Sequence, residues 1–412
     1  MEDFPYPLPM LLDGATGTAL EAAGMPADIY RPGGIGAEQW ILQHPDALRS
    51  LQNAYIDAGS QAVLAPTFGA NASLLAAYGL EGRVAELNAE LVHLTQSVAK
   101  PRGVLVGGSV CPSGLFVPPY GEADFDDIYD LYRQQIRALG KAGVDFIAIE
   151  SQTSLADMRA AVLAARTTDL PVFVTIAVDE SGHTVTGSSL LPVVITLQAM
   201  GVDAIGLNCL LDPMLPLIEE VRLHTAVPII AKPDVRSSDE TLLTPESFAQ
   251  KMRLLMQAGA RIVGGHDDST PEHIAALKEV VQEFGEPEIP EEPDCYASTI
   301  ETEAFFLGDD IAFSEPLACT SHLADDLIDL EDDRCNTALV EVESLDDALL
   351  LAENSGMTRL PIAVHCDSAP VLDAALRYFQ GRLIVDSECQ IEDEVLNLLR
   401  PNMAPFFINI AC

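Results

Sequence analysis

Three residues with metal-binding side chains stand in two segments far apart in the sequence: Cys209, and the adjacent pair His266 and Asp267. A thiolate, an imidazole and a carboxylate are all good zinc ligands, and a catalytic zinc uses three protein ligands with a fourth position open. The simpler interpretation makes Cys209 a small core residue and His266-Asp267 part of a polar turn before a helix at Pro271. Spacing alone leaves both interpretations open.

A single carboxylate, Glu150, follows the apolar run Phe146–Ile149. A charged group at the end of a buried strand needs a partner of opposite charge. That partner is either the ammonium group of a ligand or a lysine or arginine of the chain, for which Lys232 is the nearest candidate.

The segment Asp13–Thr18 combines two glycines with two threonines near the start of the chain. Its backbone amides and hydroxyls suit a small carboxylate or phosphate. The glycines equally suit a tight turn, and no complete phosphate-loop or dinucleotide-binding fingerprint accompanies them.

Short apolar segments alternate with helical patterns from Met10 to Gly265, which indicates βα units in a parallel sheet. The segments are nearly all apolar, as expected where one strand face lies inside a barrel and the other under a helix. Helical spacing of apolar residues is clear in Asp124–Ala142 and Thr244–Ala258. The eight candidate strands are Met10–Leu12, Ala62–Ala65, Val104–Gly107, Phe146–Ile149, Val172–Ile176, Ala204–Leu207, Val227–Ala231 and Arg261–Val263.

Polar or glycine-rich residues directly follow the strands, as in Asp13–Thr18, Glu150–Thr153, Asn208-Cys209 and Gly264–Asp268. The carboxyl ends of barrel strands meet at one rim, which is the active face of this architecture. The sequence therefore predicts a (β/α)8 TIM barrel, residues 1–285, with its candidate functional residues gathered on one rim.

A proline-rich acidic segment, EPEIPEEPD, begins at Glu286 and predicts an extended linker over residues 286–300. Residues 301–412 then show a smaller α/β pattern, too short for a second full barrel. Its expected strands are Thr337–Val342, Leu360–His365, Arg382–Asp386 and Pro405–Ile410, and its expected helices are Leu345–Asn354, Ala369–Phe379 and Ile391–Leu399.

The chain carries 63 acidic and 22 basic residues, a formal charge of −41, so nucleic acid and anionic membrane surfaces are not expected partners. No apolar run reaches the roughly 18 residues of a membrane helix, and Met1–Pro9 lacks the features of a signal peptide. The eight cysteines are dispersed without CxxC pairs. This usage is typical of reduced thiols, so we expect a cytoplasmic protein.

The first 285 residues or so resemble the homocysteine S-methyltransferases, a family that includes betaine-homocysteine methyltransferase and the homocysteine-binding domain of cobalamin-dependent methionine synthase. The second of these is the closer resemblance. The motifs that carry it, in chain order, are LLDGATGT (Leu11–Thr18), APTFGAN (Ala65–Asn71), GGSVCPSG (Gly107–Gly114), IESQTSLADMRAA (Ile149–Ala161), GLNC (Gly206–Cys209) and GGHDDSTPEHI (Gly264–Ile274).

The resemblance implies a zinc ion that is bound by three cysteines and that holds the homocysteine thiolate. Cys209 matches the first, whereas His266 and Asp267 stand where the family has two adjacent cysteines, and Asp268 replaces the following glycine. Imidazole and carboxylate are accepted zinc ligands. One thiolate, one carboxylate and one neutral histidine make the zinc complex neutral, which lowers the thiol pKa further but makes the thiolate less nucleophilic.

The same resemblance implies an amino-acid pocket. Glu150 would receive the amino group of homocysteine, and Asp13, Gly14, Thr18 and Asn208 would line the pocket. Two further departures are Cys111, in place of a usual glycine, and AKPDV (Ala231–Val235), in place of a proline-asparagine-alanine-glycine run.

The second domain resembles part of the pterin-binding barrel of methionine synthase, through Leu360–Glu388. About half of such a barrel is present and its opening motif is missing, so we expect a remnant that does not hold methyltetrahydrofolate alone. No cobalamin-binding segment follows, so a corrinoid would be supplied by a partner protein.

These features favour a metal-assisted thiol methyltransferase in which zinc on Cys209, His266 and Asp267 activates homocysteine. A methylated corrinoid protein is the preferred donor, with sulfonium or betaine-like donors as alternatives. A second hypothesis is a docking subunit of a corrinoid methyl-transfer system, in which the barrel has lost metal catalysis. A third assigns His266, Asp267 and Asp268 to a hydrolytic metal site.

Overall fold

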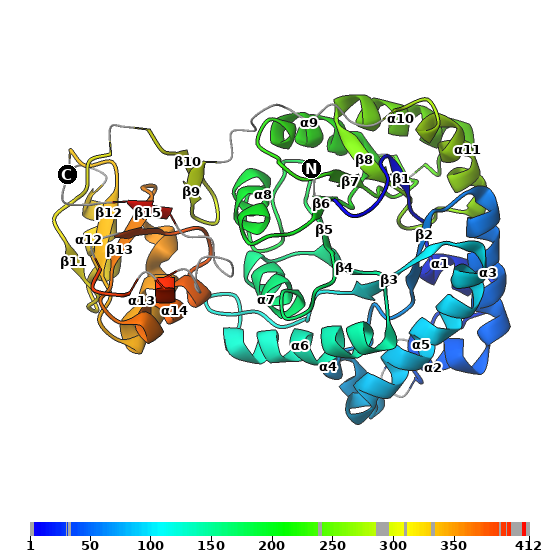
Figure 1. Ribbon diagram of the computed structural model, residues 1–412, viewed down its shortest axis with the longest axis horizontal. Coiled ribbons are helices and arrows are strands. Elements are labelled where there is room, and N and C mark those ends of the chain that lie inside the picture. The colour runs from blue at the N-terminus through cyan, green and yellow to red at the C-terminus, as the bar shows by residue number, and fades with distance from the viewer. Residues whose placement is uncertain are drawn as a thin grey trace.

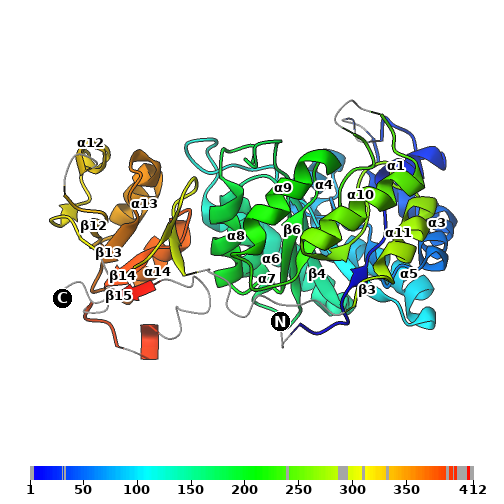
Figure 2. The ribbon, with the colours of Figure 1, turned by 90° about the horizontal axis from the view of Figure 1, so that it is seen from above.

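The computed structural model describes residues 4–29, 31, 34–237, 241–285, 296–308, 311–330, 334–386, 389–392, 394–396 and 406–408. The larger part is a ring of parallel strands enclosed by helices, and a smaller α/β unit lies beside it (Figures 1 and 2).

Eight parallel strands form the barrel in the order β1-β8-β7-β6-β5-β4-β3-β2. Between the two ends of this order, the amide of Gln61 donates to the carbonyl of Leu11 at 2.7 Å. The predicted barrel is confirmed. Its strands are β1 (Met10–Leu11), β2 (Ala62–Ala65), β3 (Leu105–Val110), β4 (Phe146–Gln152), β5 (Val172–Ile176), β6 (Ala204–Leu207), β7 (Ile229–Ala231) and β8 (Ala260–Val263).

Most barrel helices bury one apolar face against the strands, whereas every residue of α7 is buried. In α6 the first turn is acidic, which suits the helix dipole, and the helix ends at Gly143 with φ of 80°. Its residues Ile128, Tyr132, Ile136 and Leu139 recur at helical spacing and are fully buried. The barrel helices are α1 (Gly17–Ala22), α2 (Ala37–Gln43), α3 (Pro45–Ala58), α4 (Ala72–Leu75), α5 (Val84–Ala99), α6 (Phe125–Ala142), α7 (Leu155–Ala165), α8 (Leu190–Ala199), α9 (Leu211–Arg222), α10 (Pro245–Ala258) and α11 (Pro271–Val281).

The barrel interior is a packed apolar core. Phe146 and Phe173 stack with ring centroids 4.5 Å apart. The N-terminal segment covers the amino ends of the strands, because Phe4 stacks on Phe173 and the Tyr6 hydroxyl donates to the carbonyl of Asp145 at 2.6 Å. Space for a ligand is therefore left at the carboxyl ends.

Strand boundaries differ most from expectation where polar residues continue a strand. β3 runs three residues beyond the expected end at Gly107, and β4 runs three residues beyond Ile149, through Glu150 and Ser151. The apolar pattern stops at the rim, but backbone pairing continues to Gln152 with a register shift against β5. Glu150 thus projects from a strand that is paired on both sides.

The smaller unit contains a parallel sheet of five strands in sequential order. Most expected elements are present, but the expected helix Ile391–Leu399 and the ends of Pro405–Ile410 lie largely outside the described residues. Its elements are β11 (Leu317–Ala318), α12 (Leu323–Asp329), β12 (Ala338–Glu341), α13 (Leu345–Asn354), β13 (Ile362–His365), α14 (Ala369–Tyr378), β14 (Ile384–Asp386) and β15 (Phe406–Ile408).

Part of the expected linker is strand. Residues 286–295 lie outside the described part, but β9 (Ala297–Thr299) pairs in antiparallel fashion with β10 (Ala304–Phe306). The hydroxyls of Thr299 and Thr196 share a hydrogen bond of 2.7 Å, which attaches β9 to α8. Three residues of the expected linker, Ala297–Thr299, are thus paired in a strand, because the proline-rich acidic segment ends before them and they make tertiary contacts.

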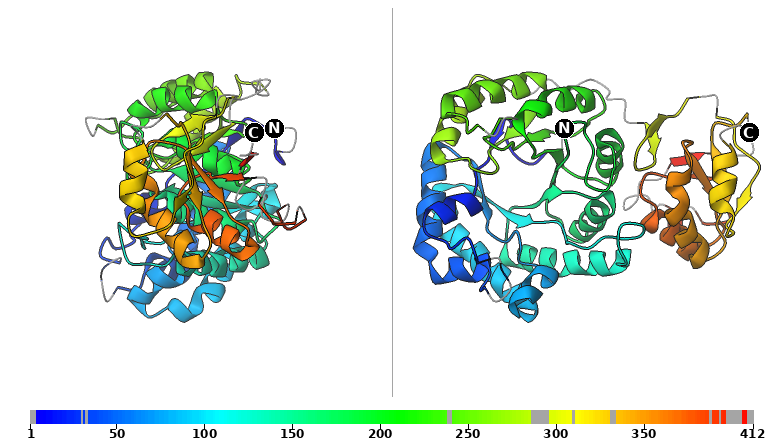
Figure 3. Two further views of the ribbon diagram at one scale, coloured as in Figure 1. Left: turned by 90° about the vertical axis from the view of Figure 1, so that its left-hand side faces the viewer. Right: turned by 180° about the vertical axis from the view of Figure 1, so that it is seen from behind.

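One arginine joins the barrel to the smaller unit. Arg159 of α7 is 1% exposed, and its guanidinium donates to the carbonyls of Leu376 (2.6 Å) and Arg377 (3.0 Å) in the last turn of α14. Carbonyls at a helix C-terminus lack intrahelical donors and carry partial negative charge, so a cation satisfies both needs. Arg377 in turn pairs with Asp126 of α6. The two units lie side by side in Figures 1 and 3.

Candidate active site at the carboxyl ends of the strands

A cavity of about 640 Å³ opens at the carboxyl ends of the barrel strands. One end is polar, with Asp13, Glu150 and Lys232 in its wall; His266 and Asp267 also line it. These residues follow or end strands β1, β4, β7 and β8. The structure thus brings the candidate residues Asp13, Glu150, His266 and Asp267 to one cavity, together with Lys232.

His266 and Asp267 lie together with a residue that the sequence analysis did not select, Asp234. One ligand atom of each of the three lies within 4.8 Å of the others. His266 Nδ1 and Asp234 Oδ1 are 2.7 Å apart, and Nδ1 lies 3.9 Å from Asp267 Oδ2. Burial lowers the pKa of His266, but the hydrogen bond to Asp234 and the charge of Asp267 outweigh it, so the net shift is upward.

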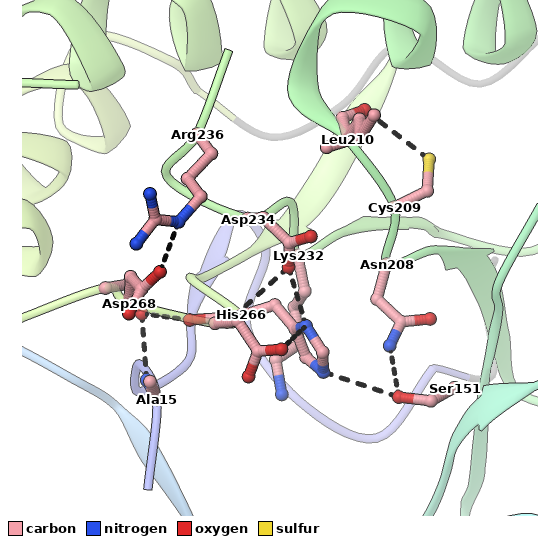
Figure 4. A network of polar contacts seen from close by, with 12 residues as sticks. Ala15, Ser151, Asn208, Cys209, Leu210, Lys232, Asp234, Arg236, His266 and Asp268 are labelled. Atoms are coloured by element: carbon pink, nitrogen blue, oxygen red, sulfur yellow. Dashed lines mark hydrogen bonds and ion pairs between the residues drawn. The ribbon is translucent and has the colours of Figure 1, made fainter. Parts of the chain in front are cut away.

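Cys209 borders this group without joining it. Its carbonyl accepts the amide of Asp234 at 3.2 Å, but its thiol is directed at the carbonyl of Leu210, 3.5 Å away (Figure 4). Burial, and then the charge of Asp234, raises the pKa of the thiol to about 12. At neutral pH this thiol is therefore protonated.

A hydrogen-bonded chain runs from Asn208 through Ser151 to His266 (Figure 4). The Asn208 amide donates to Ser151 Oγ, which lies 3.4 Å from His266 Nε2. Ser151 has φ of 57°, a left-handed conformation that costs energy in a residue with a side chain. Asn208 therefore supports the histidine through Ser151 and does not line the cavity in the described part of the chain.

Glu150 and Lys232 form a buried ion pair, with side chains 9% and 5% exposed. The second carboxylate oxygen of Glu150 accepts the Ser109 hydroxyl at 2.6 Å. Burial alone would raise the pKa of Glu150, but Lys232 and Ser109 stabilise the carboxylate, so its pKa is lowered. The intramolecular partner that the sequence left open is Lys232.

Asp13 is a second buried carboxylate in the cavity wall, 2% exposed. Its Oδ2 accepts the amide of Leu64 at 2.8 Å, whereas Oδ1 has no hydrogen-bond partner among the described residues. Burial raises the pKa of Asp13 to about 7, although Lys232 opposes the shift.

The raised pKa of Asp13 predicts a pH dependence of stability. Because the folded protein holds this proton more tightly than the unfolded chain, the contribution of Asp13 is greatest below about pH 4 and is lost as the pH rises through 7. A rise from 3.8 to about 7 corresponds to on the order of 4 kcal/mol. We expect Asp13→Asn to flatten the fall in unfolding free energy over this range, measured by urea titration.

The matched control for this measurement is Asp46→Asn, because the Asp46 side chain is 92% exposed. The control should keep the wild-type pH profile. An Asp13→Asn profile parallel to that of the wild type would show that Asp13 does not titrate in this range.

Two other residues expected in the amino-acid pocket, Thr18 and Gly14, contact neighbouring loop residues. Thr18 is not one of the described residues that line the cavity. Its hydroxyl accepts a hydrogen bond from the amide of Asp268 at 3.2 Å. This bond supports the turn at Asp268, where φ is 62°. Gly14 lines the cavity, and a Cβ there would lie 2.6 Å from Ser269 Oγ. Only glycine fits this packing.

Asp234 was not among the predicted site residues, although it lies in AKPDV, the segment that departs from the resemblance. Glu38 of α2 is a further cavity residue outside the sequence prediction; it is 8% exposed and lines the cavity together with Phe68 and Tyr78. No periodic or motif signal marks Glu38, because the helix reaches the cavity only after folding.

Eight parallel strands closed by helices, with a cavity at the strand carboxyl ends, place the chain in the (β/α)8-barrel class of proteins. The chain belongs to the homocysteine S-methyltransferase family, whose model matches residues 10–281. This is a family of methyltransferases, as the motifs predicted.

Curated relatives include methionine synthase of Mycobacterium tuberculosis, 30% identical over 68% of this chain and 25% of that protein. Methionine synthase of Mycobacterium leprae is 25% identical over 92% of this chain and 35% of that protein. The chain thus spans about a quarter to a third of the length of these relatives. Among solved structures, the metallated form of the homocysteine methyltransferase MmuM from Escherichia coli matches with 26% identity and a TM-score of 0.57, over 66% of this chain and 95% of that one.

Proposed function

We propose that this chain transfers a methyl group to the thiol of homocysteine beside a bound zinc ion. The observation that carries the proposal is that one cavity reaches both His266 and Asp267, which suit a metal, and the charged end with Asp13, Glu150 and Lys232, which suits an amino acid.

Zinc fits the donor groups present. Cys209, His266 and Asp267 are the proposed ligands, and the position of Asp234 makes it a further candidate. A bound zinc lowers the pKa of a coordinated thiol and so favours the reactive thiolate. Cys209 would have to lose its proton and turn from Leu210 to join the set. The hydrogen bonds of Asp234 and Ser151 hold the His266 ring, which sets the direction of its nitrogens.

The charged end of the cavity binds and orients the amino acid in this proposal. Glu150 and Asp13 receive the ammonium group, Gly14 permits close approach of the backbone, and Thr18 and Asn208 act indirectly by holding the loops. Fixing the amino-acid end positions the sulfur beside the metal ligands.

The donor proposal includes a methylated corrinoid protein or a small cationic donor. Glu38 supports the cationic donor, because it is a buried carboxyl group in the cavity wall that forms no ion pair among the described residues, and burial raises its pKa. A sulfonium or quaternary ammonium group would pair with the carboxylate and contact the rings of Phe68 and Tyr78.

The proposal predicts methionine formation. Purified chain should convert homocysteine to methionine with at least one of three donors: a methylated corrinoid protein, a methylsulfonium or a betaine. Mass spectrometry of the product detects the methionine formed.

If the donor is cationic, Glu38→Gln should raise the KM for the donor by about 10- to 100-fold, the effect of losing one charge-assisted contact, and leave the KM for homocysteine unchanged. Both constants follow from rates of methionine formation, and Glu86→Gln, at an exposed helix position, is the control.

Failure of every donor would show that homocysteine methylation is the wrong assignment. The docking-subunit hypothesis would then gain support if an inactive, metal-free barrel co-purified with a corrinoid protein. A hydrolytic metal site is the weaker alternative, because Asp268 is paired with Arg236 and lies outside the metal-binding group.

A cytoplasmic location is part of the same proposal. The six described cysteines are free thiols, as expected in a reducing compartment. In the described part of the chain, no helix has the length and apolar character needed to cross a membrane.

A further inference from the structure

The polar part of the cavity wall contains both hydrogen-bond donors and a hydrogen-bond acceptor that have no partner among the described residues. The ammonium of Lys232 has Glu150 as its one hydrogen-bond partner among the described residues, which leaves two N–H donors. Asp13 Oδ1 is a buried acceptor without a partner in the same part of the chain. Buried polar groups normally find partners, so both point to a ligand.

The charged groups in this part of the wall are also unbalanced, because one ammonium group faces two carboxyl groups. Lys232 is 4% exposed and faces two buried carboxylates, Asp13 and Glu150, both of which lie in the cavity wall with it. The ion pair with Glu150 holds the Lys232 side chain as an ammonium group within this wall. A ligand with one positive and one negative group would satisfy the spare acceptor and the spare donors together.

We propose that Lys232 binds the carboxylate of an α-amino acid whose ammonium group is received by Asp13 and Glu150. Lys232 then makes the cavity specific for amino-acid thiols and rejects thiols that lack the carboxylate. The inference rests on the proposed function and names the group that selects its substrate. The simpler role, in which Lys232 only neutralises Glu150, predicts no such selection.

Binding of unreactive ligands separates these two roles without a methyl donor. The probes are methionine, the proposed product, and methylthiopropylamine, which is methionine without its carboxylate. Both carry the ammonium group, so the ratio of their dissociation constants reports the carboxylate alone. Isothermal titration calorimetry on the full chain gives this ratio.

The variants are chosen so that folding is preserved. Lys232→Met alone leaves Glu150 buried without its cation, which destabilises strongly. The test is therefore the double variant Lys232→Met/Glu150→Gln compared with Glu150→Gln, because this pair differs only at position 232. Circular dichroism checks that both are folded, and Lys251→Met, on the surface with its side chain 39% exposed, is the control.

We expect the wild type, Lys251→Met and Glu150→Gln to bind methionine about 10- to 100-fold more tightly than methylthiopropylamine, the range of a charge-assisted hydrogen bond. In the double variant the preference should fall at least tenfold. A folded double variant that keeps the preference of Glu150→Gln would overturn the role of Lys232 and leave the proposed function standing. Absence of methionine binding to the wild type would contradict both.

Discussion

Replacing His266 with alanine should abolish metal binding and reduce methyl transfer by at least about 100-fold. Even groups that only orient a metal ligand typically contribute about 10- to 100-fold to affinity or activity, and His266 is the central donor of its group. It lies 2.7 Å from Asp234 and 3.9 Å from Asp267. Mass spectrometry of protein purified without chelators should find about one zinc per wild-type chain, and none in His266→Ala.

Variants of two cysteines test whether Cys209 belongs to the metal-ligand set. Cys209→Ala should lose the metal if the thiol turns from Leu210 to coordinate it, as proposed. Cys111→Ala is the matched control, since Cys111 is also buried and follows a barrel strand, but its thiol contacts Asn71 and Pro112. Zinc retained by Cys209→Ala and lost in His266→Ala would remove Cys209 from the ligand set and leave Asp234 in its place. Zinc retained in His266→Ala would contradict the site.

Replacing Arg159 with alanine should lower the free energy of unfolding by about 2 to 5 kcal/mol. The change removes the donors to two helix-terminal carbonyls, each costing about 1 to 3 kcal/mol when left buried and unpaired. It also removes the contact of the guanidinium with the ring of Phe125, 5.8 Å from its centroid. Urea titration measures the loss, and earlier cleavage in the smaller unit during limited proteolysis would locate it.

Arg133→Ala is the control for Arg159, because Arg133 of α6 pairs with Asp130 but is 38% exposed. Such exposed pairs contribute about 1 kcal/mol or less. If Arg159→Ala is as mild as this control, the attachment of α14 to the barrel depends on Arg377 and Asp126, which form the neighbouring ion pair.

The fold was predictable because its signal is local. Buried parallel strands are short apolar runs, and three of the eight barrel strands match their expected ranges: Ala62–Ala65, Val172–Ile176 and Ala204–Leu207. The ends of β3 and β4 were not predictable, because there backbone pairing continues into polar residues. The strand pair β9-β10 was not predicted for a similar reason: β9 is held in place by a tertiary contact, the hydrogen bond between Thr299 and Thr196 of α8.

The site was predictable in its location and in part of its membership. Strands β1, β4 and β8 each deliver a polar residue to the same rim, so the grouping of Asp13, Glu150, His266 and Asp267 could be predicted from sequence order alone. Asp234 was not selected, because an aspartate in a loop after β7 has no distinguishing pattern until the loop brings it 2.7 Å from His266.

The sequence by itself determined the barrel, its family and the rim on which the chemistry would lie, because periodicity and motif order are properties of neighbouring residues. Only the tertiary structure decided which side chains interact. It paired Lys232 with Glu150, left Asp13 Oδ1 without a hydrogen-bond partner among the described residues, and directed the thiol of Cys209 at the carbonyl of Leu210, away from His266. Those outcomes depend on side-chain directions and burial across strands far apart in sequence, which no local pattern encodes.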